Sequence, residues 1–319
     1  MSPRLRAFCI IFGCAAAYGL VARLLFAFRP LQDWLQIVSA AFMYSMPFSL
    51  GALVCFLGWK IDRPSRFWSL VAPPLTMLVL LAGSVLVFLE ALFCALVAAP
   101  VVLLFALLGG WLMSVLLRRR DRSRLQLAVW LLLPYLVAPL EQAWEQPDEQ
   151  RVIRDAIVIR SPPERIWSQI REVPTIRPEE LRWRWIYGLG FPRPLAATLD
   201  REGVGGRRLA TFERNVSFYE EVTVWQPPVR LAFTIRADPA FIPRTAFDEH
   251  IIVGGRFYDV LDGTYSIEPC DQGSCLLHLA STHRLSTVFN RYAGWWSEWV
   301  MHQIQGSILE VIRARCERG

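Results

Sequence analysis

The first 144 residues contain apolar runs that are too long for the core of a soluble domain. The longest, Ser69–Leu117, has Glu90 as its only charged residue. A helix needs about 20 apolar residues to cross the roughly 30 Å hydrocarbon core of a bilayer. From Glu145 onward, charged and apolar residues mix as they do in a soluble α/β domain. The sequence therefore predicts a membrane part followed by a water-facing part, with the change near Trp144.

The membrane part is expected to contain about five transmembrane helices. The run Ser69–Leu117 is too long for one helix and should fold back near Glu90, because a carboxylate belongs at a wet turn rather than in mid-bilayer. The last run, Leu125–Leu140, is short and contains two prolines, so it qualifies only when it is extended to Trp144. The first run is longer than a signal-peptide core and is expected to stay in the mature protein. The expected helices cover residues 7–28, 34–59, 69–89, 92–117 and 125–144.

The charge of the chain separates at the same boundary. Up to Trp144 there are twelve Arg and Lys against five Asp and Glu, which gives +7 and leaves −1 of the total +6 for the remainder. The basic excess thus lies between hydrophobic segments, where positive residues set the orientation of membrane helices. Nucleic acid is therefore not expected as a partner, in spite of the high isoelectric point.

Positive residues also predict the orientation. They collect at the N-terminus, around Lys60 and at Arg118–Arg124, which are alternate connections between spans and can all be cytoplasmic. With the N-terminus inside, a fifth span delivers the C-terminal domain to the outer face of the plasma membrane. In a bacterium this means an inner-membrane protein with a periplasmic domain. If residues 125–144 only lie on the bilayer surface, the domain is cytoplasmic instead.

Two cysteines of the C-terminal part bear on its redox compartment. Cys270 and Cys275 flank a four-residue, glycine-containing turn between two strand-like runs, which places the thiols across a hairpin. A disulfide there would indicate an oxidising compartment, and two unpaired thiols at a loop are an equally good interpretation. One Cys pair lacks the second ligand pair that a zinc site needs, so no metal is expected.

The C-terminal part reads as a mixed helix and strand domain. Residues 151–160 alternate apolar and polar side chains as a half-buried strand does. Ser161 as N-cap, Pro162 in the first helical position and Glu164 predict a short helix directly afterwards. A long helix is expected over residues 286–315, with an apolar stripe along one side. Further strands are expected at residues 195–201, 207–213, 216–225, 230–237, 263–268 and 275–284.

The same order of elements carries a resemblance to a known superfamily. The run Ile157–Trp167, the segments Glu221–Pro228 and Gly263–Pro269, and the long C-terminal helix resemble the SRPBCC superfamily, the START-like or polyketide-cyclase-like helix-grip domains. The resemblance covers about Arg151–Glu317. It implies an α+β fold, in which a curved antiparallel sheet surrounds the C-terminal helix and a cavity lies between them. The superfamily has no shared catalytic motif, so no catalytic residue and no cofactor is implied.

Aromatic side chains are the candidates for lining such a cavity, although each of them can also be plain core. Trp183, Trp185 and Tyr187 differ from the others because they alternate with arginines in a segment rich in Pro and Gly. That pattern fits a cavity mouth or an amphipathic edge at the membrane interface. The candidates on the expected strands and closing helix are Tyr219, Phe233, Tyr265, Trp295, Trp296 and Trp299.

Candidates for chemistry are few. His278 and His283 are five residues apart and should face opposite sides of a straight strand, which makes a two-histidine metal site unlikely to form. Glu298 and His302 are four apart and can pair on the closing helix. The sequence has no Gly-x-Ser-x-Gly, His-Glu-x-x-His or Walker motif. The polar strand residues that could point inward are Glu213, Glu221, Arg236, His278 and His283.

Three functions remain open. The favoured one is a non-catalytic binding domain for a lipid or other hydrophobic small molecule, anchored in the membrane and held at its outer face. The alternative is an enzyme of the cyclase or dehydratase kind that uses the same cavity. The third is a sensor or assembly subunit without a ligand, whose surface or spans bind a protein partner.

Overall fold

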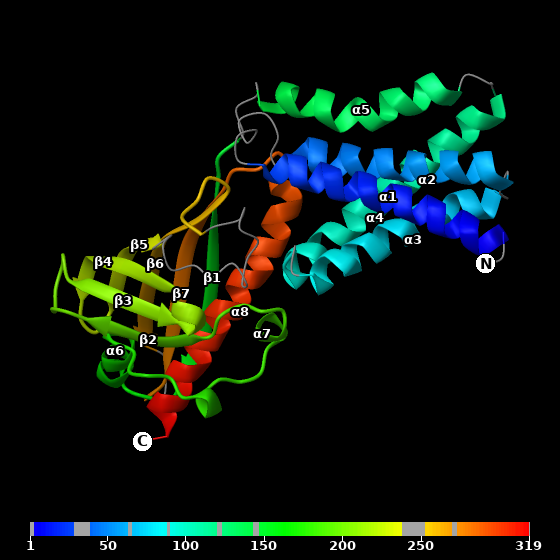
Figure 1. Cartoon of the computed structure of the whole chain (residues 1–319). Coiled ribbons are helices and arrows are strands. Elements are labelled where there is room, and N and C mark those ends of the chain that lie inside the picture. Colours follow the sequence, from blue (N-terminus) through cyan, green and yellow to red (C-terminus); the bar gives the residue numbers. More distant parts are fainter. Residues whose placement is uncertain are drawn as a thin grey trace. The chain divides into compact units, whose positions relative to one another are not determined.

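The computed structural model divides the chain into two compact units, Met1–Gln146 and Pro147–Gly319 (Figure 1). It describes residues 3–28, 39–62, 66–87, 90–119, 123–142, 147–237, 253–269 and 273–318. Trp144, Cys270 and the start of the expected second span lie outside these residues.

The first unit consists of helices in the order expected from the apolar runs. Among the residues that the structure describes, four helices are long and apolar enough to cross a membrane, whereas the apolar part of the last, Leu127–Glu141, is shorter. The long apolar run breaks between two helices, at Glu90, whose carboxylate lies 2.6 Å from Nε of Arg23. The elements are α1 (Pro3–Ala27), a π-helical turn η2 (Ala41–Ser45) that leads into α2 (Met46–Asp62), α3 (Arg66–Leu86), α4 (Leu92–Arg119) and α5 (Ser123–Gln142).

Helices α2 and α4 approach each other through glycines. A Cβ atom on Gly51 of α2 would overlap the backbone carbonyl of Ala106, and one on Gly109 of α4 would overlap the carbonyl of Phe48. Close backbone contact of this kind is typical of helix pairs in membranes. The hydrophobic effect does not drive association there, and small residues allow the close packing that does.

Helix α5 is bound to its neighbours by hydrogen bonds to its backbone. Pro134 has no N–H, so the carbonyl of Trp130 lacks its donor within the helix. Ser49 of α2, which is fully buried, donates its hydroxyl to that carbonyl at 2.5 Å. Tyr18 of α1 donates to the carbonyl of Leu131 at 3.0 Å. The carbonyl freed by Pro134 is thus satisfied by a side chain of α2, and α1 adds a bond to the neighbouring carbonyl.

The end of α5 is fixed in the same way. Glu141 is buried, and its carboxylate accepts the backbone N–H groups of Ala40 and Ala41 at 2.7 and 3.0 Å. These N–H groups lie at the start of a helical segment, where the first N–H groups have no acceptor within the helix itself. The opposite side of α5 exposes large apolar side chains at intervals of three and four residues, namely Val129, Leu132, Leu136 and Leu140.

The second unit contains one seven-stranded sheet with the order β1-β7-β6-β5-β4-β3-β2. Every neighbouring pair is antiparallel. The strands are β1 (Glu149–Ile159), β2 (Pro194–Leu199), β3 (Arg207–Phe212), β4 (Ser217–Gln226), β5 (Arg230–Ala237), β6 (Tyr258–Pro269) and β7 (Cys275–Leu285). The helices are α6 (Pro163–Arg171), a four-residue α7 (Trp185–Gly188) and the long α8 (Asn290–Glu317), with 3-10 turns η3 (Pro178–Glu180) and η4 (Glu213–Asn215).

Local sequence accounts for most of these boundaries. The glycine-rich link between β2 and β3 turns because Gly203 and Gly205 adopt positive φ angles of 103° and 80°, which favour glycine. The start of α6 is one residue later than expected. Pro162 is the N-cap, Pro163 begins the helix, and Ser161 makes no capping hydrogen bond. Strand β6 begins at Tyr258, five residues before the expected start at Gly263.

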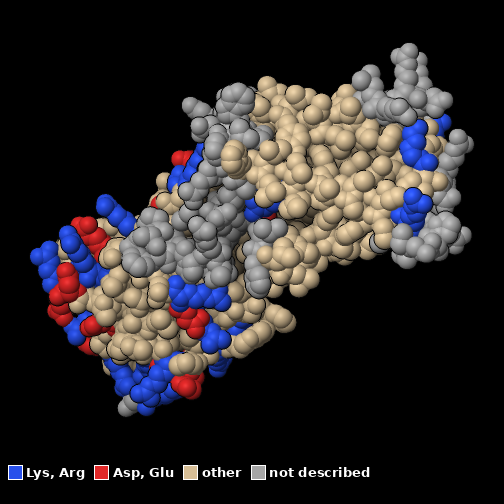
Figure 2. All heavy atoms as spheres, in the orientation of Figure 1, with Lys and Arg blue, Asp and Glu red and all other residues tan. Residues whose placement is uncertain are grey.

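Helix α8 crosses one face of the curled sheet (Figure 1). Its C-terminal half packs through Leu309 and Ile312 into an apolar core that also contains Trp167 of α6 and the inner side chains of β4 to β7. The expected antiparallel sheet with a long C-terminal helix is therefore confirmed, and the second unit has the architecture of a helix-grip domain. On the visible face, charged side chains cover this unit, whereas the helical unit is largely uncharged (Figure 2).

Candidate functional site

The alternation of β4 decides which of its side chains face α8. Glu220 and Val222 are buried on the inner face, whereas Tyr219 and Glu221 are exposed. Tyr219 is 54% exposed, so the expectation that it and Glu221 line an interior was wrong. The two neighbouring glutamates point to opposite faces because successive strand side chains alternate, and the buried one is Glu220.

Four other expected interior residues also lie elsewhere. Arg236 is exposed on β5, and His278 lies on the outer face of β7, where its Nε2 is 3.4 Å from the carboxylate of Glu268. Glu213 belongs to the turn η4 and accepts the backbone N–H of Arg193. Trp295 is 62% exposed on α8. In contrast, His283 is fully buried on the inner face, so the two histidines do face opposite sides of the strand.

The inner face of the sheet carries a buried ion pair that joins β3 and β4. Arg208 and Glu220 stand directly opposite each other, with Nη1 and Oε2 2.9 Å apart. The guanidinium lies 4.6 Å from the ring centroid of Phe233 on β5, and the Phe233 ring lies 6.2 Å from that of Tyr265 on β6. Gly263 makes room for this arrangement, because a Cβ atom there would meet the Phe233 ring. Four adjacent strands thus contribute to one interior cluster.

The ion pair leaves part of its hydrogen-bonding capacity unused. Arg208 is 2% exposed and Glu220 is 8% exposed. Nη1 of Arg208 and Oε2 of Glu220 face each other in the ion pair without hydrogen-bond geometry, and Nε of Arg208 has no hydrogen-bond partner among the residues that the structure describes. A buried polar group without a partner costs about 1–3 kcal/mol. Such groups are rare in native interiors and are commonly satisfied by water or a ligand.

Burial changes the proton affinity of the same cluster. It raises the pKa of the Glu220 carboxyl, and the charge of Arg208 opposes that shift. It also raises the pKa of the Tyr265 hydroxyl to about 12, again opposed by Arg208. The cluster therefore holds a guanidinium and a carboxyl side by side within an apolar core that includes Val222, Leu231 and Phe233.

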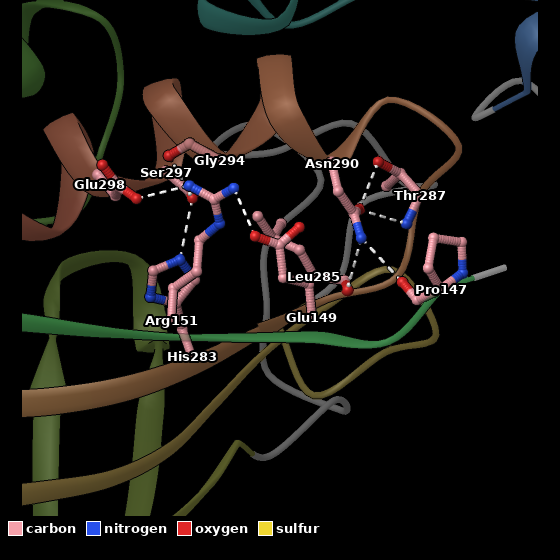
Figure 3. Close-up of polar contacts among 10 residues, drawn as sticks. All are labelled: Pro147, Glu149, Arg151, His283, Leu285, Thr287, Asn290, Gly294, Ser297 and Glu298. Atoms are coloured by element: carbon pink, nitrogen blue, oxygen red, sulfur yellow. Dashed lines mark hydrogen bonds and ion pairs between the residues drawn. The ribbon is translucent and has the colours of Figure 1, made fainter.

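A second polar cluster fixes the N-terminal half of α8 to the sheet (Figure 3). Arg151 of β1 lies between two carboxylates, with Nη1 2.6 Å from Glu298 on α8 and Nη2 2.6 Å from Glu149. Its guanidinium passes over Gly294, where a Cβ atom would overlap it. Glu298 therefore pairs across to the sheet and not with His302, which bonds Asp155 of β1 at 2.9 Å through Nδ1.

His283 belongs to this second cluster. Its Nε2 is 2.9 Å from the hydroxyl of Ser297, which also donates to the carbonyl of Gly294. Among the described residues, its Nδ1 has no partner. Burial, and then the charge of Arg151, lower its pKa to about 4, so the imidazole is neutral at neutral pH. A Ser-His pair without an orienting carboxylate on the other ring nitrogen lacks the third member of a catalytic triad.

The start of α8 also binds Pro147, the first residue of the second unit. The side-chain amide of Asn290 donates to the carbonyls of Pro147 and Leu285 at 2.8 and 3.2 Å, and its oxygen accepts the N–H of Thr287 (Figure 3). Asp148 accepts a hydrogen bond from Ser286. Pro147 is therefore fixed to the N-terminal end of α8.

The segment around α7 lies on the other side of α8. Arg184 reaches Glu310 at 2.9 Å and Gln303 at 3.2 Å, and the hydroxyl of Tyr187 donates to Ser307 at 2.7 Å. Burial raises the pKa of the Tyr187 hydroxyl, and the Ser307 bond opposes that shift. These contacts fix the segment, and yet Trp183 and Trp185 are 62% and 71% exposed.

Sequence reasoning found part of this arrangement. Phe233 and Tyr265 are buried on the inner face, and Trp296 and Trp299 are half-buried on α8. Arg208 and Glu220 were missed. Their only sequence signal is their position in the strand alternation, since Arg208 shares a parity with the apolar Ala210 and Glu220 shares one with Val222.

The described residues bear on the metal and disulfide expectations in different ways. Within the described ranges, no three His, Cys, Asp or Glu side chains gather as metal ligands. Cys275 is buried at the start of β7. Because Cys270 lies outside the described residues, the disulfide between them stays a prediction.

Comparisons with known proteins give similarity at the level of the second unit. No family model matches the sequence, and no curated protein matches it. A truncated norcoclaurine synthase from Thalictrum flavum is 11% identical with a TM-score of 0.34, covering 54% of this chain and 96% of that chain. An uncharacterized protein from Bacillus thuringiensis is 13% identical with a TM-score of 0.34, covering 52% and 98%.

A third similar structure is an uncharacterized protein from Rhizobium leguminosarum, 13% identical with a TM-score of 0.34, covering 55% of this chain and 99% of that chain. The activity in the name of the norcoclaurine synthase is a property of that enzyme and is not assigned to this chain. The helix-grip description rests on the strand order and on the position of α8, and not on these similarities.

Proposed function

We propose that the chain is a membrane-anchored binding protein for a lipid or another hydrophobic small molecule that carries a hydrogen-bonding group. The helix-grip unit would hold the ligand without catalysis, and the helical unit would keep it at the outer face of the plasma membrane, the periplasmic face in a bacterium. Membrane anchoring and ligand binding have separate support and separate tests.

Support for anchoring comes from the four long apolar helices and from the way α5 is built. A backbone carbonyl freed by proline is tolerated within a bilayer when a neighbouring helix supplies a donor, and Ser49 supplies one to Trp130. The opposite side of α5 is apolar and exposed, as expected for a lipid-facing surface. Helix α5 would then be a fifth span, which with a cytoplasmic N-terminus directs the second unit outward.

The observation that carries the binding proposal is the Arg208–Glu220 pair. A buried ion pair is weak support for stability, because apolar residues of similar volume are often as good or better. Nε of Arg208 is a buried donor without a hydrogen-bond partner among the described residues, and Oε2 of Glu220 meets the guanidinium only through the ion pair at 2.9 Å. The pair is neutral as a whole, so it suits an uncharged head such as a hydroxyl, which can accept from Nε of Arg208 and donate to Oε2 of Glu220.

The same pair favours one second candidate, the cyclase or dehydratase. A carboxyl whose pKa is raised by burial can exchange protons with a reacting group, and Glu220 is such a carboxyl. In that case Glu220 would act as the acid and base, and the interior would hold a substrate that is converted. A sensor or assembly subunit would have no ligand at all.

Native mass spectrometry of the detergent-purified full chain, followed by lipid extraction, separates the three. We expect a hydrophobic molecule to co-purify with the wild type and to be lost from the double variant Arg208→Met with Glu220→Leu, which leaves no uncompensated buried charge. Arg236→Met is the control, since Arg236 is exposed on the outer face. A molecule that is chemically altered by the wild type and unaltered by Glu220→Gln would support the enzyme. An empty wild-type protein would contradict the binding proposal.

The side of the membrane has its own test. A cysteine introduced as Gly319→Cys should react with a membrane-impermeant thiol reagent, or a compartment-specific reporter fused at Gly319 should be active, if the C-terminus lies outside. A cytoplasmic C-terminus would remove α5 from the set of spans and leave the ligand test unaffected.

A further inference from the structure

We propose that the tryptophan-bearing face of α8 and the α7 segment form a docking surface for the bilayer interface, and that the second unit lies on anionic lipid headgroups through it. The surface consists of Trp183, Trp185, Trp295, Trp296 and Trp299. The inference rests on the proposed membrane anchoring and adds to it the orientation of the second unit.

The aromatic residues of α8 lie on one side of the helix, away from the sheet. Gly294, Ser297 and Glu298 contact β1 and β7. Trp295 and Trp299 are four residues apart and therefore share a face that is turned from those contacts. Ring centroids of Trp295 and Trp296 are 4.7 Å apart, and those of Trp296 and Trp299 are 6.4 Å apart, so the indoles form one group.

The α7 segment continues the same face. Arg184 contacts Gln303, Gly306 and Glu310 of α8. Gln303 is one turn beyond Trp299, so the anchoring contacts follow the tryptophans along one side of the helix. Trp183 and Trp185, which flank Arg184, pack edge to face with centroids 4.8 Å apart.

The exposed tryptophans are held rigidly. Ile186, next to Trp185 in the chain, is fully buried, and Arg184, between the two tryptophans, is held by its ion pair with Glu310. Exposed apolar groups on a rigid support are typical of interaction sites, because little ordering is needed on binding. Trp in particular suits the headgroup region, where one end of the ring meets lipid and the N–H meets water.

Two features favour the bilayer as the occupant. Arg182 and Arg291 are exposed next to Trp183 and one turn before Trp295, which adds positive charge beside the aromatic rings. An amphipathic surface with basic residues beside Trp binds anionic lipid interfaces.

The second feature is the chain connection. Five peptide links separate the end of α5 at Gln142 from Pro147, and five residues span at most about 18 Å. Pro147 is bonded to Asn290. Trp295 follows Asn290 by five residues, or about 7.5 Å along the helix axis. A bilayer that contains α5 is therefore within reach of this face.

The test is hydroxyl-radical footprinting of the full chain in nanodiscs of phosphatidylcholine and phosphatidylglycerol, with one protein copy per disc. Tyr219, which is 54% exposed on the outer face of the sheet, serves as the internal reference. After correction for intrinsic reactivity, oxidation of Trp183, Trp185 and Trp295 should be about threefold or more below the value their exposure gives, because interfacial side chains lie about 5–10 Å within the headgroup boundary. Discs of phosphatidylcholine alone should weaken the protection, because they lack anionic headgroups. About 1 M salt should also weaken it, since the Debye length falls to roughly 3 Å.

A variant separates docking from local packing. Trp183→Ala with Trp185→Ala should raise oxidation of Trp295 in anionic discs, while Val229→Ala, a change at a residue that is 55% exposed and outside the surface, should not. Both tryptophans are exposed, so the melting temperature of the variant should stay close to that of the wild type.

The outcomes distinguish the two proposals. A chain that does not incorporate into discs overturns the anchoring proposal and this inference together. A chain that incorporates, but whose tryptophans oxidise in proportion to their exposure, overturns the docking surface alone. Protection that needs two copies per disc overturns the bilayer as occupant and indicates a second copy of this chain.

Discussion

The Arg208–Glu220 pair allows a sharp test of why a charged pair lies inside the sheet. Removing one partner leaves the other charge buried and uncompensated, which typically costs about 3–5 kcal/mol. Replacing both with apolar residues of similar size is often neutral or stabilising by about 1–4 kcal/mol. Both residues are less than 10% exposed, so solvent screening does not reduce these magnitudes much. We therefore expect Arg208→Met to be strongly destabilising and the double variant Arg208→Met with Glu220→Leu to be at least as stable as the wild type.

Thermal unfolding of the full chain in nanodiscs measures this difference. For a unit of this size, each 1 kcal/mol shifts the melting temperature by about 2–4 °C, so the single variant should lose about 6–20 °C. The double variant should recover that loss and still lose the co-purifying molecule. Recovery of stability without recovery of ligand would show that the pair serves binding and not folding.

The pH dependence adds an independent check on Glu220. Burial raises its pKa in the folded state above the value in the unfolded chain. Between those two values the folded state binds more protons, so stability should fall as pH rises through this window. The double variant should lack this dependence. A double variant as unstable as the worse single variant would refute the reasoning, because the pair would then be a structural requirement.

Three further predictions concern packing and pH. Ser49→Ala leaves a carbonyl of α5 without its donor and should destabilise the helical unit by about 1–2 kcal/mol, measured by denaturant unfolding in micelles, whereas Ser114→Ala serves as the control because that hydroxyl bonds only within α4. Gly294→Ala should displace the Arg151 guanidinium and lower the free energy of unfolding by about 1–3 kcal/mol. An unchanged midpoint of denaturant unfolding would show that the Arg151 guanidinium does not need the space above Gly294. Arg315 lowers the pKa of the Glu180 carboxyl to about 2 through a hydrogen bond, so its stabilisation is full above the ordinary pKa of 4.5 and is lost as pH falls toward 2. Glu180→Gln should therefore lower the melting temperature at neutral pH. A difference in melting temperature between variant and wild type that persists near pH 2 would contradict this role of Glu180.

Much of the architecture follows from local sequence. The apolar runs indicate the helical unit, since a bilayer core demands about 20 apolar residues in succession. The alternation of Ile153, Asp155, Ile157 and Ile159 predicts the first strand with its buried face, and these four side chains do share the inner face. The turn at Gly203 and Gly205 is also local, because positive φ angles favour glycine regardless of the rest of the chain.

The polar sites depend on contacts between distant segments. Glu298 and His302 can pair along a helix, but each finds a partner on β1, about 147 positions away in sequence. In the same way, nothing in the sequence of α5 indicates that its broken hydrogen bond is completed by Ser49. Such pairings are decided by which elements pack together, and local periodicity carries no information about that.

The sequence by itself thus determined the apolar helices, the strand periodicity and the long closing helix, because these follow from the spacing of residue types along a few turns or strand residues. Only the tertiary structure decided that Glu220 faces inward while Glu221 faces water. A shift of one residue in a strand exchanges its two faces, and the register is set by pairing with β3 and β5. The identity of the interior pair was therefore fixed by the partners of β4 and not by its own residues.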